Sequence, residues 1–414
     1  MQLVEQTILD RRDPRFAEID QAAFAAKNLF NAANYLVRQS FIFQGIYLDH
    51  VKVFHQIKTH EAYRALPAKV SNSILIQLHK AWMSFFEAMK EWNAHPEKFT
   101  GRPKLPKYKH KEHGRFLLTY DKQAIGKRIF KKTGMLAPSG LACLIPTKIT
   151  DWEKIDQLRI VPRTGFYVLE VVYQKAPEPK EVDPRLVLAL DLGVNVLAAA
   201  TSNKEGFTPR LVSGKPLKSL NQYYNKQRAE HQQRLSRSKH PRYTSRALDQ
   251  LTMKRNRRIQ HYLHAASRRI IDLCVAEGIG RIVVGKNPLW KQEVNLGHKT
   301  NQAFVQIPHA RFIDLLRYKG ELVGILVVTQ EESYTSKASF LDLDPIPTYQ
   351  PDRSEKPVFS GKRIARSWYQ AKDGTVIHAD MNGSWNILRK SSSDPLQVGR
   401  GVAGAAVPPR RLAV

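Results

Sequence analysis

The chain of 414 residues is long enough for two or three domains, and with 42% hydrophobic residues we expect most of it to fold. Lys and Arg number 66 against 37 Asp and Glu, and the resulting net charge of +29 predicts a polyanionic partner such as nucleic acid. No stretch approaches the roughly 18 uninterrupted apolar residues of a membrane-spanning helix, and the N-terminus lacks the layout of a signal peptide. We therefore expect a cytoplasmic protein, associated with the nucleoid when bound to DNA, with no membrane partner. The two cysteines, Cys143 and Cys274, exclude a disulfide scaffold and a four-cysteine zinc site.

The N-terminal region predicts one strand followed by a helical module. Residues Gln2 to Leu9 read as the strand, and apolar residues then recur every three or four positions from Ile19 to Leu36, as in an amphipathic helix. A second helix is expected from near Ser71. Its apolar side chains are Ile74, Leu78, Trp82, Phe85, Met89 and Trp92. An aromatic stripe at helical spacing is more often core than a stacking platform for bases, so we assign it to packing.

A basic segment, GRPKLPKYKHKEHGR, follows at residues 101–115. Its two prolines disfavour a helix, so an extended linker is expected. A solvated, disordered loop is the simpler interpretation of such a segment. The positive charge elsewhere in the chain favours contacts to backbone phosphates instead, with Lys104, Lys107 and Lys109 as candidates.

Short apolar or β-branched runs alternate with turns from Phe116 to Gln174, which predicts a small antiparallel barrel. The N-terminal strand would complete that barrel, so the helical module would be an insertion into it. The proline-rich stretch KAPEPKEVDPR at 175–185 is then expected to be a linker.

The stretch LVLALDLGVNVLAAA at 186–200 places one acid, Asp191, in an apolar run that is followed by Gly193 and a second apolar run. This pattern predicts a hairpin of core strands with a carboxylate in its middle. A buried carboxylate needs a partner, and a hard cation shared with other acids is one solution. An isolated Asp at a turn explains this stretch alone equally well.

Two long, basic helices are expected between Gly214 and Ile270, where fifteen Lys and Arg face only Glu230 and Asp249. A solvated helix face usually mixes both signs, so a face of one sign indicates a nucleic-acid contact. The candidate residues are Lys226, Arg228, Lys254, Arg255, Arg257 and Arg258.

Strands and helices alternate in the remainder, as in an α/β domain. Strands are expected at Arg281–Val284 and at Ile325–Val328, and the second is closed by Glu331 and Glu332. Residues 340–374 read as a loop insertion. Asp380 then precedes a short helix that carries Asn382 and Asn386. These serve either in a functional role, orienting Asp380 or approaching phosphate, or as capping and packing residues. The last twenty or so residues read as a disordered tail.

Asp191, one of the two glutamates and Asp380 thus stand at strand ends or helix starts of one predicted domain. Carboxylates that converge in a basic protein suit a site for phosphodiester cleavage with two Mg²⁺ ions, in which one ion activates water and the other stabilises the leaving oxygen. The absence of clustered His or Cys disfavours zinc.

In their order, the motifs LALDLGVNVLAA, RIVVGKN, LRYKGELVGILVV, SYTS and HADMNGSWNIL resemble the RuvC-like nuclease domain of the transposon-encoded TnpB family, relatives of the type V CRISPR effectors. The helical region and its basic exit resemble that family's recognition module, so the resemblance covers nearly the whole chain. It implies an RNA-guided DNA endonuclease in which a guide RNA from the transposon end pairs with double-stranded target DNA beside a short flanking motif. It also implies catalytic and metal-binding roles for Asp191, Asp380 and a third acid, and we expect a monomer with one RNA.

Two departures from the family pattern stand out. The usual Glu at the end of the strand at 281–284 is replaced by Gly285, and no cysteine follows Thr335-Ser336, so no zinc finger can form. Loss of the acid would mean an inactive nuclease. We favour relocation of the acid to Glu332, with Glu331 as the fallback, because alternation places the two on opposite faces and only one can reach the metals.

The expected fold class is a multidomain α/β protein. A β-barrel wedge domain (1–14 and 114–180) receives the helical recognition module with its basic linker (15–113), and an RNase H-like, RuvC-type nuclease domain (181–391) follows. Residues 341–375 replace the zinc finger, and 392–414 form the tail. The alternatives to a nuclease are an inactive RNA-guided protein that represses transcription by occupancy, and a generic RNA- or DNA-binding protein.

Overall fold

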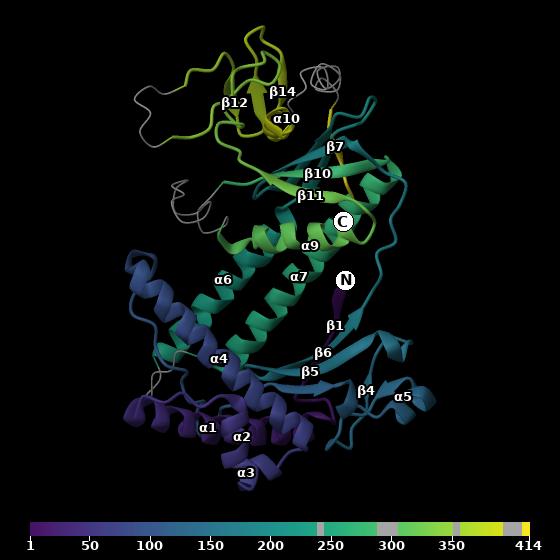
Figure 1. Ribbon diagram of the computed structural model, residues 1–414. Coiled ribbons are helices and arrows are strands. Elements are labelled where there is room, and N and C mark those ends of the chain that lie inside the picture. The colour runs from purple at the N-terminus through teal and green to yellow at the C-terminus, as the bar shows by residue number, and fades with distance from the viewer. Residues whose placement is uncertain (238–243, 288–304, 351–356, 392–407) are drawn as a thin grey trace. The chain divides into compact units, whose positions relative to one another are not determined.

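The computed structural model describes residues 1–237, 244–287, 305–350, 357–391 and 408–414. The chain divides into two compact units, an N-terminal unit of Met1–Lys175 and a C-terminal unit of Ala176–Val414 (Figure 1).

The N-terminal unit combines a helical module with antiparallel strands. Its helices are α1 (Phe16–Gln44), α2 (His50–Ile57), α3 (Glu61–Arg64), α4 (Ala68–Ala94) and α5 (Lys127–Thr133), with short 3-10 turns at Pro96–Lys98, Lys122–Ala124 and Trp152–Lys154. Its strands are β1 (Gln2–Asp10), β2 (Leu118–Asp121), β3 (Met135–Leu136), β4 (Ile145–Pro146), β5 (Ile155–Arg163) and β6 (Phe166–Gln174). The helices α1–α4 lie between β1 and β2 in the sequence, so the helical module is an insertion between two strands of one sheet.

The main sheet of this unit is open. Its strand order is β1-β6-β5-β2, and β3 pairs only with β4. β1 does join β6 over its whole length, from Gln2 opposite Gln174 to Asp10 opposite Phe166. Within residues 1–175, however, no pairing closes β1 onto β2, so the expected barrel is not found.

The core of the helical module lies between α1 and α4. The expected stripe is buried at Ile74, Leu78 and Trp82, whereas Phe85, Met89 and Trp92 are only half-buried. Trp82 is fully enclosed, and its indole N–H donates to Oδ1 of the buried Asn34 over 3.0 Å. The amide of Asn34 in turn donates to the carbonyl of Pro106 over 3.0 Å. Packing therefore accounts for the buried half of the stripe, as predicted.

The basic linker is extended and lies along α1. Asn31 holds the backbone of Lys109 through two hydrogen bonds of 2.8 and 2.9 Å, and Arg38 donates to the carbonyl of Pro106 over 3.0 Å. The side chains of Lys104, Lys107 and Lys109 remain exposed. These contacts fix the path of the linker and leave its ammonium groups available to a partner.

The C-terminal unit is an α/β structure around a six-stranded sheet of order β11-β10-β7-β8-β9-β15. The strands of the unit are β7 (Asp183–Leu192), β8 (Val196–Ser202), β9 (Arg210–Ser213), β10 (Ile279–Gly285), β11 (Leu326–Gln330), β12 (Lys362–Ala365), β13 (Trp368–Gln370), β14 (Val376–His378) and β15 (Arg410–Arg411). Its helices are α6 (Lys215–Ser236), α7 (Arg246–Ala276), α9 (His309–Glu321) and α10 (Ala379–Ser391). β7, β10 and β11 run parallel to one another, and β8 is antiparallel to β7.

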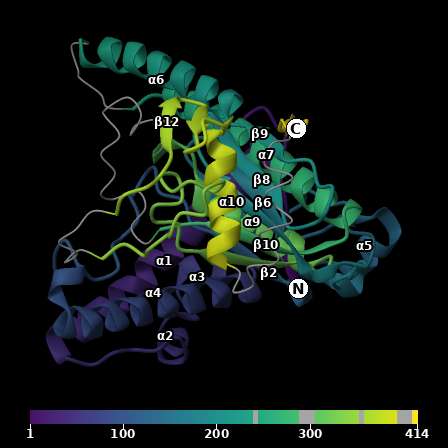
Figure 2. The same cartoon turned by 90° about the horizontal axis from the view of Figure 1, so that it is seen from above.

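Alternation along β7 and β10 divides the side chains between the two faces of this sheet. Leu188, Leu190, Ile282 and Val284 pack with residues of α7 and α9. Val187, Ala189 and Val283 pack on the other face with Trp385 and other residues of α10, which crosses the sheet (Figure 2). Because parallel strands end at one edge, the residues that follow β7, β10 and β11 are brought together there.

Two segments expected to be irregular contain strands. Within the 340–374 segment, β12 pairs with β13, which in turn pairs with β14, in a three-stranded antiparallel sheet; residues 351–356 lie outside the described residues. Residues 392–407 of the expected tail also lie outside them. Beyond these, Arg410 and Arg411 form β15 and pair in parallel with Arg210 and Leu211, so this end of the expected tail is ordered.

None of the helices within the described residues combines the length and apolar character needed to cross a membrane.

Replacing Trp82 by Phe should lower the free energy of unfolding, because it leaves the buried carbonyl oxygen of Asn34 without its donor. We expect a loss of about 1–3 kcal/mol, measured by chemical denaturation. Trp92→Phe on the same helix is the matched control, and it should cost about 0.5 kcal/mol because that ring is half-buried. Equal losses in the two variants would contradict a structural role for the Asn34–Trp82 bond.

Candidate active site

Asp191 lies near the end of the central strand β7, in the row of side chains that faces α10. Alternation groups it with Val187 and Ala189, both of which pack against this helix. The approach is close: a Cβ placed on Gly383 of α10 would lie only 2.6 Å from Asp191 Oδ2. A glycine at this point of the helix thus makes room for the carboxylate. The hairpin predicted around Asp191 is present, with Asp191 opposite Ala199 of β8.

Glu332 lies two residues beyond β11, and its carboxylate occupies the space above Gly285 at the end of β10. A Cβ placed on Gly285 would overlap Glu332 Oε2 and would lie 2.5 Å from Ile387 Cδ1. Gly285 follows Val284, which is opposite Leu190, so it stands beside Asp191 in the next register position. The backbone N–H of Glu332 donates to Asn287 Oδ1 over 3.0 Å, which fixes the loop against the end of β10.

Glu331 is engaged elsewhere. Its carboxylate forms an ion pair with Lys390 of α10 and accepts a 2.6 Å hydrogen bond from the backbone N–H of Ser333. Burial opposes ionisation, but the hydrogen bonds from Lys390 and Ser333 lower the pKa of Glu331. Both glutamates follow the last strand residue, Gln330, so the loop rather than strand alternation separates their directions. The geometry favours Glu332 over the fallback.

Asp380 lies in the first turn of α10, three residues before Gly383. Its Oδ1 is 3.7 Å from Nη2 of Arg363, which comes from β12. The same guanidinium also donates to the carbonyl of Arg366. Arg363 is therefore a cationic group at the carboxylates that the sequence did not suggest, because it lies in a segment expected to be a loop.

The three carboxylates interact electrostatically. Burial, followed by the negative charges of Glu332 and Asp380, raises the pKa of Asp191 well above its ordinary value, against the opposing charge of Arg363. Burial and the charge of Glu331 raise the pKa of Glu332 to about 7, and Lys390 opposes this shift. Acids with raised pKa values at one sheet edge are a recognised mark of a functional site.

The donor chemistry at this edge suits Mg²⁺, since all three side chains offer oxygen and a bound cation would relieve their repulsion. Within the described residues, however, no group of three or more His, Cys, Asp or Glu side chains is arranged to hold a metal ion as it lies. The ion pair between Asp380 and Arg363 is one observed contact that competes with a cation.

The two asparagines of α10, Asn382 and Asn386, are structural. Asn382 accepts from the N–H of Phe340 and donates to the carbonyl of Ala338, and Asn386 donates to Ala338 and Thr335. These hydrogen bonds hold the segment after Glu332, and none of them is made to Asp380. Packing, one of the two interpretations of these residues, thus explains both.

Gly383 and Asn287 are supporting residues that sequence reasoning missed. A glycine inside a helix costs about 1 kcal/mol relative to alanine, so Gly383 was a detectable sign of close approach. Asn287, two residues after Gly285, had no feature in the sequence that indicated its contact with the backbone of Glu332.

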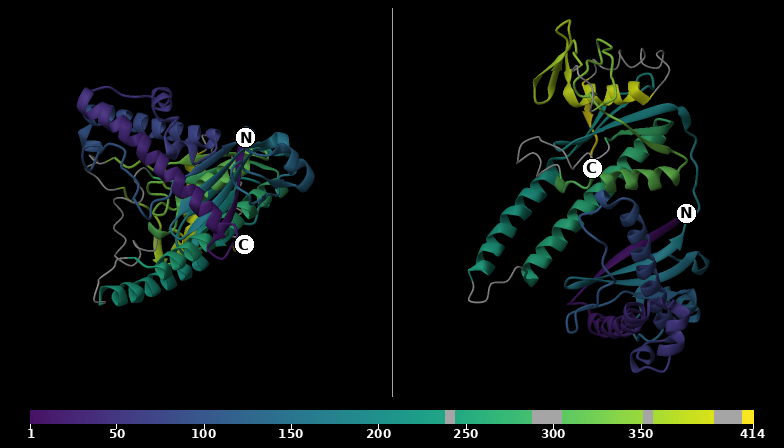
Figure 3. Two further views of the ribbon diagram at one scale, coloured as in Figure 1. Left: turned by 90° about the horizontal axis from the view of Figure 1, so that it is seen from below. Right: turned by 60° about the vertical axis from the view of Figure 1, so that its left-hand side comes forward.

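The basic candidates on α6 and α7 divide into two groups. These helices lie side by side (Figure 3), and Lys226, Arg228, Lys254, Arg257 and Arg258 are exposed. Arg255 differs, because its guanidinium donates to Asn221 over 2.6 and 2.8 Å and to the carbonyl of Gln306 over 3.1 Å. Arg255 therefore joins α6, α7 and the segment before α9, and we assign it to packing rather than to phosphate.

The raised pKa of Glu332 predicts a pH-dependent stability. Its carboxyl binds a proton more tightly in the folded chain than in the unfolded chain, so the folded state holds more protons between about pH 4.5 and 7. The free energy of unfolding should fall as pH rises through this window, by about 2 kcal/mol after allowance for partial exposure. Glu332→Gln should reduce this slope in chelator, measured by urea denaturation, and leave the part due to Asp191, whereas Glu321→Gln on α9 should leave the whole slope unchanged. An equal slope in the wild type and Glu332→Gln would show that Glu332 is not the titrating group.

Comparisons with known proteins agree with the motifs. Residues 170–290 match the family model described as "Probable transposase", and residues 309–387 match "Cas12f1-like, TNB domain". No curated protein matches the sequence significantly. A solved Cas12f1–sgRNA–target DNA complex shares 15% identity over 92% of this chain and 83% of its own, with a TM-score of 0.52. Alicyclobacillus acidoterrestris C2c1 with single-guide RNA shares 10% identity over 94% of this chain and 70% of its own, with a TM-score of 0.40.

The first of these structures has the same mixed α/β fold as this chain. The two family models match in succession from the end of β6 through most of the C-terminal unit, and their ranges include all three acids of the site. In sequence, the chain thus resembles a transposase family over residues 170–290 and the Cas12f1-like TNB domain over residues 309–387, and in fold it resembles the Cas12f1 structure.

Proposed function

We propose that the chain is an RNA-guided, Mg²⁺-dependent DNA endonuclease of a transposon. Its RuvC-type site would consist of Asp191, Glu332 and Asp380. The observation that carries this proposal is the position of the Glu332 carboxylate in the space above Gly285, beside Asp191. In this way the third acid is retained although the strand position that usually bears it holds a glycine.

The burial of the carboxylates supports the proposal. An inactive chain gains nothing from keeping Asp191 and Glu332 close together and desolvated, since burial of like charges lowers stability. A bound cation would offset this cost. The site is thus built at the expense of folding, as functional sites often are.

Each side chain has a separate role in this proposal. Asp191, on the central strand, would hold Mg²⁺ together with Glu332 from the loop after β11 and Asp380 from the first turn of α10. When bound, Mg²⁺ would activate the attacking water and stabilise the leaving oxygen. Ion-paired Lys390 and Glu331 hold the loop that carries Glu332, and Asn287 fixes its backbone. Arg363, which pairs with Asp380, would approach the phosphate backbone at the same edge.

Guide RNA and target DNA would bind to the exposed cations described above. The lysines of the basic linker lie along α1 on an extended backbone. The exposed lysines and arginines of α6 and α7 project from two adjacent helices. Phosphate contacts of this kind position a nucleic acid without reading its sequence. A guide derived from the transposon end would then supply the sequence specificity.

One observation favours an inactive, RNA-guided DNA-binding protein as the second candidate. Arg363 pairs with Asp380, and no group of acids among the described residues is arranged to hold an ion as it lies. Such a protein would repress transcription by occupying its target. Guide-directed binding without cutting in any divalent ion would select this alternative.

Asp191→Ala and Asp380→Ala should each abolish cleavage of a matching plasmid by the RNA complex purified with the chain. Loss of about 3 kcal/mol of transition-state stabilisation corresponds to a rate at least about a hundredfold lower. Thermal stability in chelator should not fall for Asp191→Ala, because the change removes a buried charge. Unchanged cleavage by either variant would contradict the site.

Moving the acid back to the strand tests the role of Glu332 directly. Glu332→Ala should remove cleavage, and Gly285→Glu in the Glu332→Ala background should restore part of it, because the new carboxylate enters the vacated space. Gly285→Glu with Glu332 retained should lower stability, since the two side chains would overlap. Glu331→Gln is the matched control and should retain cleavage. The proposal that Glu332 replaces the acid missing at position 285 would be contradicted if the Gly285→Glu/Glu332→Ala chain were as inactive as Glu332→Ala while binding Mg²⁺ as tightly as the wild type.

A further inference from the structure

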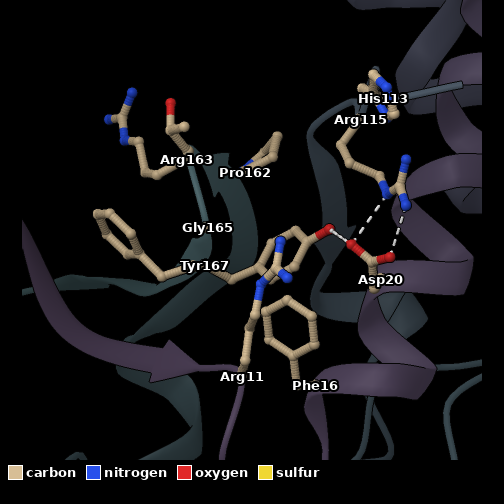
Figure 4. Close-up of a pocket in the computed structure, with 11 residues that line it drawn as sticks. Arg11, Phe16, Asp20, His113, Arg115, Pro162, Arg163, Gly165 and Tyr167 are labelled. Carbon is tan, nitrogen blue, oxygen red and sulfur yellow. Dashed lines mark hydrogen bonds and ion pairs between the residues drawn. The ribbon is translucent and has the colours of Figure 1, made fainter. Parts of the chain in front are cut away.

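The N-terminal unit contains a cavity of about 790 Å³ that the proposed nuclease chemistry does not use. It lies where the end of β1, the start of α1 and the β5–β6 hairpin meet (Figure 4). Its volume is in the range of sites for small organic ligands. Three arginines and three aromatic rings are among the residues that line it: Arg11, Arg115, Arg163, Phe16, Phe166 and Tyr167.

The acid of this cavity is already satisfied. Asp20 accepts two hydrogen bonds from Arg115, of 2.6 and 2.9 Å, and a third of 2.7 Å from the hydroxyl of Tyr167. Figure 4 shows these three side chains together on one side of the cavity. The network neutralises one arginine and removes Asp20 as a source of repulsion for an anion.

Two guanidinium groups remain for a ligand. Within residues 1–175, the side chain of Arg163 makes no hydrogen bond or ion pair. The guanidinium of Arg11 also makes neither, but it lies 5.9 Å from the ring centre of Phe16, and its charge contributes to the lowered pKa of Asp20. Both residues are exposed. Asp10, close to this end of β1, is paired with Arg12 over 2.7 Å. The cavity therefore presents unneutralised positive charge to the solvent.

The hairpin places a flat apolar ring beside one of these cations. Gly165, with φ of +86°, allows the tight turn between β5 and β6, so Arg163 and Phe166 are direct cross-strand partners and project to the same side. Phe16 and Phe166 are half-buried, which leaves part of each ring open, whereas Tyr167 is enclosed. A ring and a guanidinium side by side match a planar base joined to a phosphate.

We propose that this cavity binds one nucleotide of a nucleic-acid strand, with its base against Phe166 and its phosphate at Arg163 and Arg11. A free phosphate would use only the cations, and an apolar ligand would use only the rings; a nucleotide uses both. The inference rests on the proposed function only in that the chain handles nucleic acid. RNA and DNA present the same chemistry here, so the experiment distinguishes them.

Calorimetric titration of the full chain with AMP, adenosine and ribose 5-phosphate tests the site. AMP should bind at least about tenfold more tightly than either fragment, since each fragment lacks one half of the recognition. Arg163→Ala and Phe166→Leu should each weaken AMP binding at least about fivefold. Arg128→Ala, which removes another exposed arginine from α5 of the same unit, should leave AMP affinity within about twofold. Equal binding of AMP and ribose 5-phosphate, or equal effects of Arg163→Ala and Arg128→Ala, would overturn the proposal.

Ultraviolet crosslinking identifies the strand. Ribo- and deoxyribo-oligonucleotides of one sequence are crosslinked to the full chain, and the modified peptide is mapped by mass spectrometry. A crosslink at Phe166 with the ribo-oligonucleotide assigns the site to RNA, and one with the deoxyribo-oligonucleotide assigns it to DNA; a crosslink with neither would overturn the proposal. The Asp191→Ala chain should bind AMP as the wild type does, so failure of the nuclease proposal and failure of this one are distinguishable.

Discussion

The structure of the C-terminal unit depends on the burial of two like-charged carboxylates at one sheet edge. Asp191 and Glu332 are both half-buried, and burial is the largest cause of the raised pKa of each; the charge of Glu332 adds to the shift of Asp191, and that of Glu331 to the shift of Glu332. Much of the surrounding packing serves to tolerate this repulsion. Gly383 leaves room for one carboxylate, Gly285 leaves room for the other, and Ser384 ties α10 to the sheet by donating to the carbonyl of Ala189 over 3.0 Å.

The segment from 331 to 340 connects that edge to the helix that covers it. Glu331 bonds to Lys390, and Asn382 and Asn386 hold the backbone between Thr335 and Phe340. The ring of Phe340 stacks on Trp385 at a centroid distance of 5.1 Å. These contacts convert a loop, which alone would position a side chain loosely, into a fixed extension of β11.

The periodic elements of this fold were predictable from the sequence, but the contacts between distant segments were not. The runs around Asp191 and the stripe through Trp82 specify a strand pair and a helix, because burial forces alternation or a spacing of three to four. That the β1-β6-β5-β2 sheet stays open was not predictable, because an alternating pattern identifies strands but does not show whether the two outer strands, β1 and β2, pair with each other. Arg255 illustrates the same difficulty for charge: its sequence context is that of its exposed neighbours, and only the position of Asn221 on α6 shows that it is bonded within the unit.

The overlap between position 285 and Glu332 constrains the order in which substitutions can accumulate. An acid on β10 and an acid on the loop cannot occupy one space, and Ile387 closes the remaining side. A chain that exchanges one arrangement for the other must pass through a form with a small residue at 285 before the loop acid can settle, or must accept a strained intermediate. Position 285 alone suggests that the third acid is absent. Ancestry and activity in such chains therefore have to be judged from whether any residue places a carboxylate in the space above position 285, rather than from a single alignment column.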